Sequence, residues 1–117
     1  MAGMSDSLQQ LAADLKVFAA ARQWQPFHTP KNLASALAVE AAELLEPFQW
    51  LTEDQSRALP PEKLAEVGGE VADVLIYLVQ LSTALGLDPV AEARKKMVIN
   101  ARRFPAGDAG VARLDEK

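Results

Sequence analysis

Apolar side chains recur at every third or fourth position along most of this chain, which is the spacing of one face of an α-helix. The first such stripe follows a possible serine N-cap, and its residues are Ser5 or Ser7 as the cap, then Leu8, Leu11, Leu15 and Phe18. Pro26 and Pro30 follow soon after, and two prolines this close together cannot continue a helix interior. The pattern therefore predicts a first helix that ends at about Gln23 or Trp24.

Three more helices are predicted from the same spacing, because the apolar runs are rich in Ala and Leu and too long for buried strands. They run from Thr29 and Pro30 to Pro47 or Trp50, from about Glu62 to Leu85, and from Asp88 and Pro89 to Phe104. The polar stretch from Thr52 to Pro61 is interpreted as a connecting loop, and Gly86 as a left-handed C-cap. Gly68 and Gly69 weaken the third helix, which indicates either a close helix approach or a local bend. The expected fold is all-α, a bundle of four helices.

Length and composition indicate a folded protein of ordinary make-up. The chain has 117 residues, of which 50% are hydrophobic and 24% charged, so we expect one domain with a core at about residues 7–105 and a mobile tail at 106–117. It contains no cysteine, which excludes a disulfide scaffold and thiol catalysis. No apolar run is long enough for a membrane span, and no signal-peptide pattern opens the chain. We expect a soluble protein of the cytoplasm.

Two acidic pairs interrupt the apolar runs of the second and third predicted helices. Glu40 and Glu43 form the first pair, and Glu70 and Asp73 the second. A spacing of three residues places both carboxylates of a pair on one helix face, and carboxylates among apolar residues are costly unless they are compensated. A hard divalent cation would compensate them, and oxygen ligands favour Mg²⁺, Mn²⁺ or Ca²⁺ over Zn²⁺. The alternative is that the pairs lie on solvated helix faces, where Glu-x-x-Glu is a common pattern.

Charge is distributed unevenly along the chain. The net charge of -4 argues against general nucleic-acid binding, which requires a basic footprint. Basic residues crowd into the last predicted helix, as Arg94, Lys95, Lys96, Arg102 and Arg103. An acidic centre for cations and a basic helix for anions together favour a ligand with several negative charges that a metal bridges. Phosphates are the obvious class.

Four ordered motifs give the chain a family resemblance that covers about residues 11–105. They are Trp24-x-x-Phe27-His28-x-Pro30-Lys31-Asn32-Leu33, then Glu40-x-x-Glu43-Leu-x-Glu46-x-Phe48-Gln49-Trp50, then Glu70-x-x-Asp73-Val-Leu-Ile-Tyr77-Leu, and finally Lys96-Met97-x-x-Asn100-x-x-Arg103-Phe104-Pro105. In this order and at these spacings the chain resembles the MazG-like all-α nucleoside triphosphate pyrophosphohydrolases. Within them it is most similar to the dCTP pyrophosphatase branch.

The resemblance implies an activity and a set of site residues. The implied reaction splits a nucleoside triphosphate between its α and β phosphates, giving the monophosphate and pyrophosphate, with dCTP or 5-modified dCTP as the expected substrate. The implied metal ligands and catalytic residues are Glu40, Glu43, Glu70 and Asp73, holding Mg²⁺ or Mn²⁺. The implied phosphate contacts are Lys96, Asn100 and Arg103, and the implied base pocket is Trp24, Phe27, His28, Trp50 and Tyr77. A homotetramer built as a dimer of dimers is expected on the same ground.

Other interpretations remain open on the sequence. The same reaction on dUTP, on oxidised purine nucleotides or on mixed triphosphates would use the same centre with another base pocket. A non-catalytic helical oligomerisation module could keep the metal for stability. Phe27 and Trp50 could instead be plain core residues. A di-iron carboxylate bundle is disfavoured, because such bundles use Glu-x-x-His pairs and His28 is not part of one.

Overall fold

Helices make up the fold throughout the described part of the chain, residues 7–107 of this computed structural model, which contains no strand there. Their order is α1 (Leu8–Ala21), the 3-10 turn η2 (Gln25–Phe27), α2 (Pro30–Leu45), α3 (Glu53–Ser56), α4 (Pro61–Leu85) and α5 (Pro89–Arg103). The prediction of an all-α fold is confirmed. Most of the tail predicted at 106–117 lies outside the described residues.

Polar caps start three of these helices where the sequence predicted them. The side chains of Ser7, Thr29 and Asp88 each accept hydrogen bonds from backbone N–H groups in the first turn of α1, α2 and α5. Gly86 ends α4 at a φ of 70°, a left-handed conformation that costs glycine little. The predicted left-handed C-cap is therefore confirmed.

The segment between α2 and α4 is more ordered than predicted. The stretch expected to be a plain loop contains the short helix α3, whose start is fixed by a capping box. Thr52 Oγ accepts a hydrogen bond from Gln55 N at 3.1 Å, and Gln55 Oε1 accepts one from Thr52 N at 2.9 Å. Two backbone N–H groups are satisfied by this exchange, which stabilises a helix too short to show apolar periodicity.

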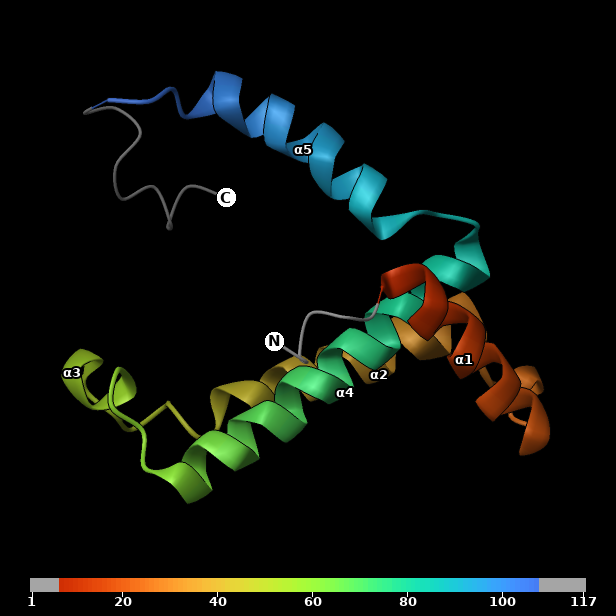
Figure 1. Ribbon diagram of the computed structural model, residues 1–117, viewed down its shortest axis with the longest axis horizontal. Coiled ribbons are helices and arrows are strands. Elements are labelled where there is room, and N and C mark those ends of the chain that lie inside the picture. The colour runs from red at the N-terminus through yellow and green to blue at the C-terminus, as the bar shows by residue number, and fades with distance from the viewer. Residues whose placement is uncertain (1–6, 108–117) are drawn as a thin grey trace. The chain divides into compact units, whose positions relative to one another are not determined.

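Helix pairing in the first compact unit, which extends to Gly86, positions the acidic pairs. α2 and α4 make the most extensive helix contact, and α1 packs on α4. α2 and α4 lie side by side and run antiparallel (Figure 1). Their neighbouring faces therefore carry the acidic pairs of both helices.

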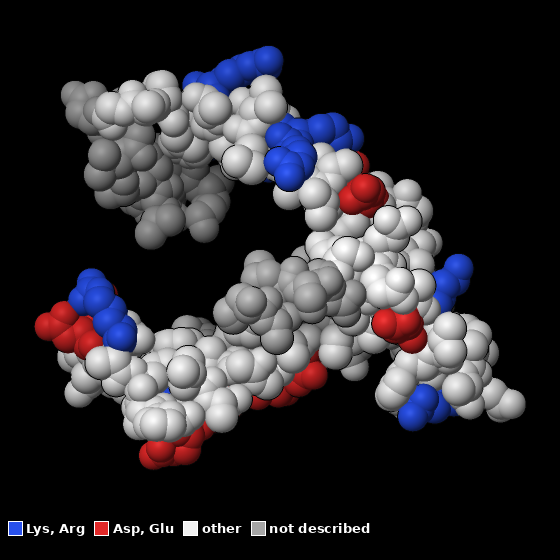
Figure 2. All heavy atoms as spheres, in the orientation of Figure 1, with Lys and Arg blue, Asp and Glu red and all other residues white. Residues whose placement is uncertain are grey.

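The buried core of this unit is small. Ala19 of α1, Leu33 of α2 and Val79 of α4 are only 2–4% exposed. Many large apolar side chains elsewhere in the described residues are exposed, Trp50 to 87% and Val17 to 70%. Much of the face drawn in Figure 2 also carries no charged side chain. One copy of the chain therefore leaves a large apolar surface in contact with solvent.

The second compact unit begins at Leu87 and contains α5. Basic side chains recur along this helix (Figure 2), and Lys95 Nζ lies 3.1 Å from Glu92 Oε2. Within residues 7–107, no single helix is long and apolar enough to cross a membrane. Among the helices of this range, only α4 and α5 taken as a pair have the length and the apolar composition of a membrane span. The prediction of a single domain stays a prediction.

Candidate metal centre

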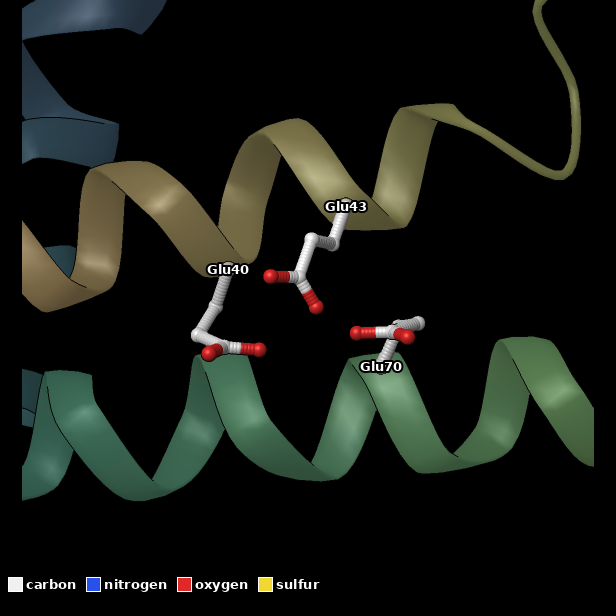
Figure 3. Close-up of side chains that lie close together, drawn as sticks. All are labelled: Glu40, Glu43 and Glu70. Carbon is white, nitrogen blue, oxygen red and sulfur yellow. The ribbon is translucent and has the colours of Figure 1, made fainter.

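Three of the predicted ligands converge between α2 and α4. Glu40 and Glu43 extend from α2 toward α4, and Glu70 extends from α4 toward α2 (Figure 3). One carboxylate oxygen from each of the three lies within 4.8 Å of the others. Because the helices are antiparallel neighbours, residues about thirty positions apart in sequence meet across one interface. A cation between these oxygens would contact both helices.

Asp73, the fourth predicted ligand, adjoins this cluster from α4. It follows Glu70 by three residues and therefore shares a helix face with it. The negative charge of Asp73 raises the pKa of both Glu40 and Glu70, and Asp73 also favours the protonated form of Glu40 as a hydrogen-bond partner. Asp73 itself is exposed, whereas the three glutamates are half-buried. The four carboxylates thus form one charged group with its open side at Asp73.

Electrostatics disfavour full ionisation of this group in the absence of a cation. Burial raises the pKa of Glu40 above 4.5, and the charges of Glu43, Asp73 and Glu70 raise it further. The pKa of Glu70 is also raised, first by burial and then by Glu43, Asp73 and other acids nearby. Like charges this close are stable together only if they share protons or a positive partner.

Two carboxylate oxygens in the cluster have no partner in the described structure. Glu40 Oε1 and Glu70 Oε1 are buried and accept no hydrogen bond there. Buried polar atoms are normally paired. Here one unpaired oxygen comes from each helix and both belong to the same cluster, which indicates a binding site for a ligand. The donor set contains only carboxylate oxygen, which suits the hard cations Mg²⁺, Mn²⁺ and Ca²⁺. The residues present fit a hard divalent metal.

The basic row predicted for phosphates lies on α5, in the second unit. Lys96, Asn100 and Arg103 are all exposed and follow one another at spacings of four and three residues, so they occupy one strip of this helix. The guanidinium of Arg103 lies 5.0 Å from the centre of the Phe104 ring. Their contact with phosphate stays a prediction.

The predicted base pocket is brought together only in part. The rings of Trp24 and His28 lie 6.1 Å apart, and Phe27, in the turn between them, is 69% exposed. Trp24 also packs edge-on against Phe18, with ring centres 5.8 Å apart. This packing shows that Trp24 has a structural role at the end of α1.

The other two predicted base contacts lie elsewhere. Trp50 follows the end of α2, whereas Trp24 precedes its start, and α2 has 16 residues, or roughly 24 Å of helix. Tyr77 is half-buried on α4, four residues after Asp73. No ring contact within residues 7–107 joins Trp50 or Tyr77 to Trp24 or His28. The five residues therefore do not form one ring-lined pocket in a single copy.

A cavity of about 150 Å³ in the first unit was not predicted from the sequence. It lies where α1, η2, α2 and α4 meet, and the three buried core residues and His28 are among its lining residues. Gln80 of α4 also lines it. The signal that could have found Gln80 is its spacing, since it follows Asp73 by seven residues, two helical turns along nearly the same face.

Fold and site together define an all-α protein with a cluster of three glutamates, Glu40, Glu43 and Glu70, that is suited to a hard divalent metal. The sequence model of the MazG-like family matches residues 36–112, and the chain belongs to this family. The family resemblance inferred from the motifs is thereby confirmed.

Named relatives lie in the same branch that the motifs indicated. The chain is 44% identical to dCTP pyrophosphatase 1 of Homo sapiens over 91 residues, 76% of this chain and 54% of that protein. It is 44% identical to the Mus musculus protein of the same name over 90 residues, 75% and 53% of the two chains. The chain spans about half the length of these relatives.

A solved structure resembles the fold over most of the chain. The crystal structure of a pyrophosphatase from Archaeoglobus fulgidus DSM 4304 superposes with a TM-score of 0.80 at 39% sequence identity. The match covers 85% of this chain and 93% of that one. The similarity therefore includes both sequence and helix arrangement.

Proposed function

We propose that this protein is a Mg²⁺-dependent nucleoside triphosphate pyrophosphohydrolase that converts a (d)NTP into the (d)NMP and pyrophosphate. The observation that carries the proposal is the convergence of Glu40, Glu43 and Glu70 across α2 and α4 with two buried, unpaired oxygens. The names of the relatives, dCTP pyrophosphatase 1 and pyrophosphatase, support this reaction. The name dCTP pyrophosphatase 1 also favours dCTP as the substrate. We further propose 5-modified dCTP as a substrate, and the removal of unwanted nucleotides from the cytoplasmic pool as the role.

The four carboxylates would hold the metal in this reaction. A divalent metal bound there supplies positive charge for the phosphate oxygens and lowers the pKa of a water molecule. Water attacks the α-phosphorus, the bond from that phosphorus to the α–β bridging oxygen breaks, and pyrophosphate departs with the bonding electron pair. A carboxylate of the cluster accepts the proton of the attacking water.

Phosphate and base contacts complete the proposal. Lys96, Asn100 and Arg103 bind phosphate oxygens, because two cations and an amide on one strip provide several donors to the same anion. Trp24, Phe27, His28, Trp50 and Tyr77 contact the base. The placement of Trp24 and Trp50 beyond opposite ends of α2 is consistent with contributions from two copies of the chain.

A homotetramer, arranged as a dimer of dimers, is proposed as the assembled form. Its support is the small buried core together with the many exposed large apolar side chains, such as Leu45, Leu64 and Trp50. Exposed apolar surface on this scale is typical of protein interfaces, and closed two-fold assemblies are the common way to cover it. Sedimentation at several concentrations measures the mass directly.

Charge-neutral variants test whether the carboxylates act in catalysis. Glu43→Gln and Asp73→Asn each remove one charge with little change in volume, and Glu62→Gln is a matched control on an exposed residue in the first turn of α4. The proposal predicts that pyrophosphate release from dCTP with Mg²⁺ falls at least a hundredfold in the two variants, while the control and all circular dichroism spectra stay unchanged. Undiminished release would contradict the proposal. If a metal-stabilised oligomerisation module is correct instead, the wild-type protein releases no pyrophosphate and Mg²⁺ raises its melting temperature.

A further inference from the structure

The cavity between α1, η2, α2 and α4 has the size of a single aromatic ring. Its volume is about 150 Å³, and an engineered apolar cavity of roughly that volume in another protein holds benzene. Leu15, Leu33 and Val79 provide much of its apolar lining, from three different helices. A fused two-ring purine needs more room than one six-membered ring, so the cavity favours a pyrimidine.

The position of the cavity relative to the carboxylates fits one nucleotide. On α2, Glu40 follows the lining residue Leu33 by seven residues, and on α4, Asp73 precedes the lining residue Gln80 by seven. Seven residues are roughly 10 Å of helix, with nearly the same facing direction. Because the helices are antiparallel, both spacings run from the cavity toward the carboxylates (Figure 1). A sugar spans such a gap between a base and its α-phosphate.

Gln80 is the lining residue best placed to read the edge of a base. Its side chain is half-buried and makes no hydrogen bond in the described part of the chain, although it borders an apolar space. Thr83 also lines the cavity, but its hydroxyl already donates to the Val79 carbonyl at 3.0 Å. Lys16 and Gln25 are exposed. His28 is also half-buried and makes no side-chain hydrogen bond in residues 7–107, but its ring lies beside Trp24 and its two nitrogens point apart. The amide of Gln80 offers a donor and an acceptor side by side, as a base edge requires.

We propose that Gln80 determines base specificity by pairing with the Watson–Crick edge of a pyrimidine held in this cavity. The proposal rests on the proposed function, since it names the base that the site receives. Of the five base contacts proposed above, His28 is the one that lines this cavity. The amide oxygen of Gln80 accepts a hydrogen bond from the amino group of cytosine, and its NH₂ group donates to the adjacent ring nitrogen. Rotation of the amide presents the reverse pattern, which matches uracil. The cavity therefore selects pyrimidines by size, and Gln80 contributes two hydrogen bonds to the selected ring.

Two substitutions that break the paired hydrogen bonds in different ways test this assignment. Gln80→Leu keeps the size of the side chain and removes both hydrogen bonds. The kcat/KM for dCTP and that for dUTP are each expected to fall about tenfold, because a bidentate hydrogen-bonded pair contributes about that factor to recognition of a base. The value for dATP is expected to change little. Gln80→Glu offers acceptors only. Against cytosine it keeps the amino contact and opposes N3, and against uracil it keeps the N3–H contact and opposes the O4 carbonyl. The kcat/KM for dCTP and that for dUTP are therefore expected to fall about tenfold each in this variant as well, with little change for dATP. Gln9→Leu, at an exposed position of α1, is the matched control.

The outcomes separate this proposal from the proposed function. Wild-type turnover that favours pyrimidines, with the two Gln80 shifts and an unchanged control, supports the assignment. Unchanged substrate ranking in both Gln80 variants, or a wild-type preference for dATP, overturns it and leaves the pyrophosphohydrolase function standing. If the wild-type protein turns over no triphosphate, calorimetric binding of dCMP, dUMP and dAMP decides the matter. The same ranking and the same Gln80 shifts then support the cavity assignment, and equal or absent binding overturns it.

Discussion

Gly68 and Gly69 lie inside α4, immediately before Glu70 of the acidic cluster. A Cβ atom built on either glycine meets no other atom within 4 Å, and neither residue has a positive φ. Alanine at either position therefore meets no steric cost in the described structure. In a helix interior alanine is favoured over glycine by about 1 kcal/mol, and part of this gain comes from restricting the unfolded chain. Gly68→Ala and Gly69→Ala are each expected to raise the free energy of unfolding by about 1 kcal/mol, and the double variant is expected to exceed either single variant.

Gly86 provides the matched control, because its φ of 70° is a left-handed conformation that strains alanine. Gly86→Ala is expected to lower the free energy of unfolding by about 1 kcal/mol. Urea unfolding followed by circular dichroism, at one fixed protein concentration, measures the wild-type protein and the four variants. Thermal melts should shift by roughly 4 °C for each kcal/mol. Destabilisation by Gly68→Ala or Gly69→Ala would refute the reasoning, since it would show that another group packs against this part of α4.

The remaining predictions concern pH, a helix cap and the basic row. The pKa of Glu40 and that of Glu70 are raised above 4.5 in the fold, so the folded chain binds more protons there than the unfolded chain. With chelator present, the free energy of unfolding should rise as pH falls from 7 toward 4.5; a decrease in urea titrations over that window would contradict the cluster's electrostatics. Thr52→Ala should cost about 1 kcal/mol of local stability in α3, seen as faster amide exchange there with little change in the rest of the chain. Lys96→Ala should raise the KM for triphosphate, whereas Lys95→Ala, whose ammonium pairs with a glutamate, should not; equal effects would remove Lys96 from the phosphate site.

Local signals in the sequence predicted the helices well. Caps such as Thr29 and Asp88, and the left-handed Gly86, act within a few residues of themselves and are visible in the chain. The exception is α3, because four residues in a polar stretch show no apolar period. Its capping box could have been read from Thr52 and Gln55.

The acidic cluster could be predicted because both acidic pairs are visible in the sequence, and only the contact between their two helices had to be assumed. Glu40 and Glu43 already share a face of α2, and any close antiparallel partner that carries another acidic pair completes the group. The aromatic set was harder to interpret, since Trp24 and Trp50 lie beyond opposite ends of α2. The cavity beside Gln80 was not predicted, because a cavity arises from imperfect packing of four segments and leaves no pattern in any one of them.

Magnesium-dependent product formation tests the central claim most directly. Wild-type protein is incubated with dCTP, with Mg²⁺ or with excess chelator, and the nucleotide and pyrophosphate products are separated by chromatography. The account predicts dCMP and pyrophosphate in equal amounts with Mg²⁺, and neither product with chelator. Release of single phosphate groups to give dCDP, or product formation that chelator leaves unchanged, would contradict a carboxylate-held metal centre that acts at the α-phosphorus.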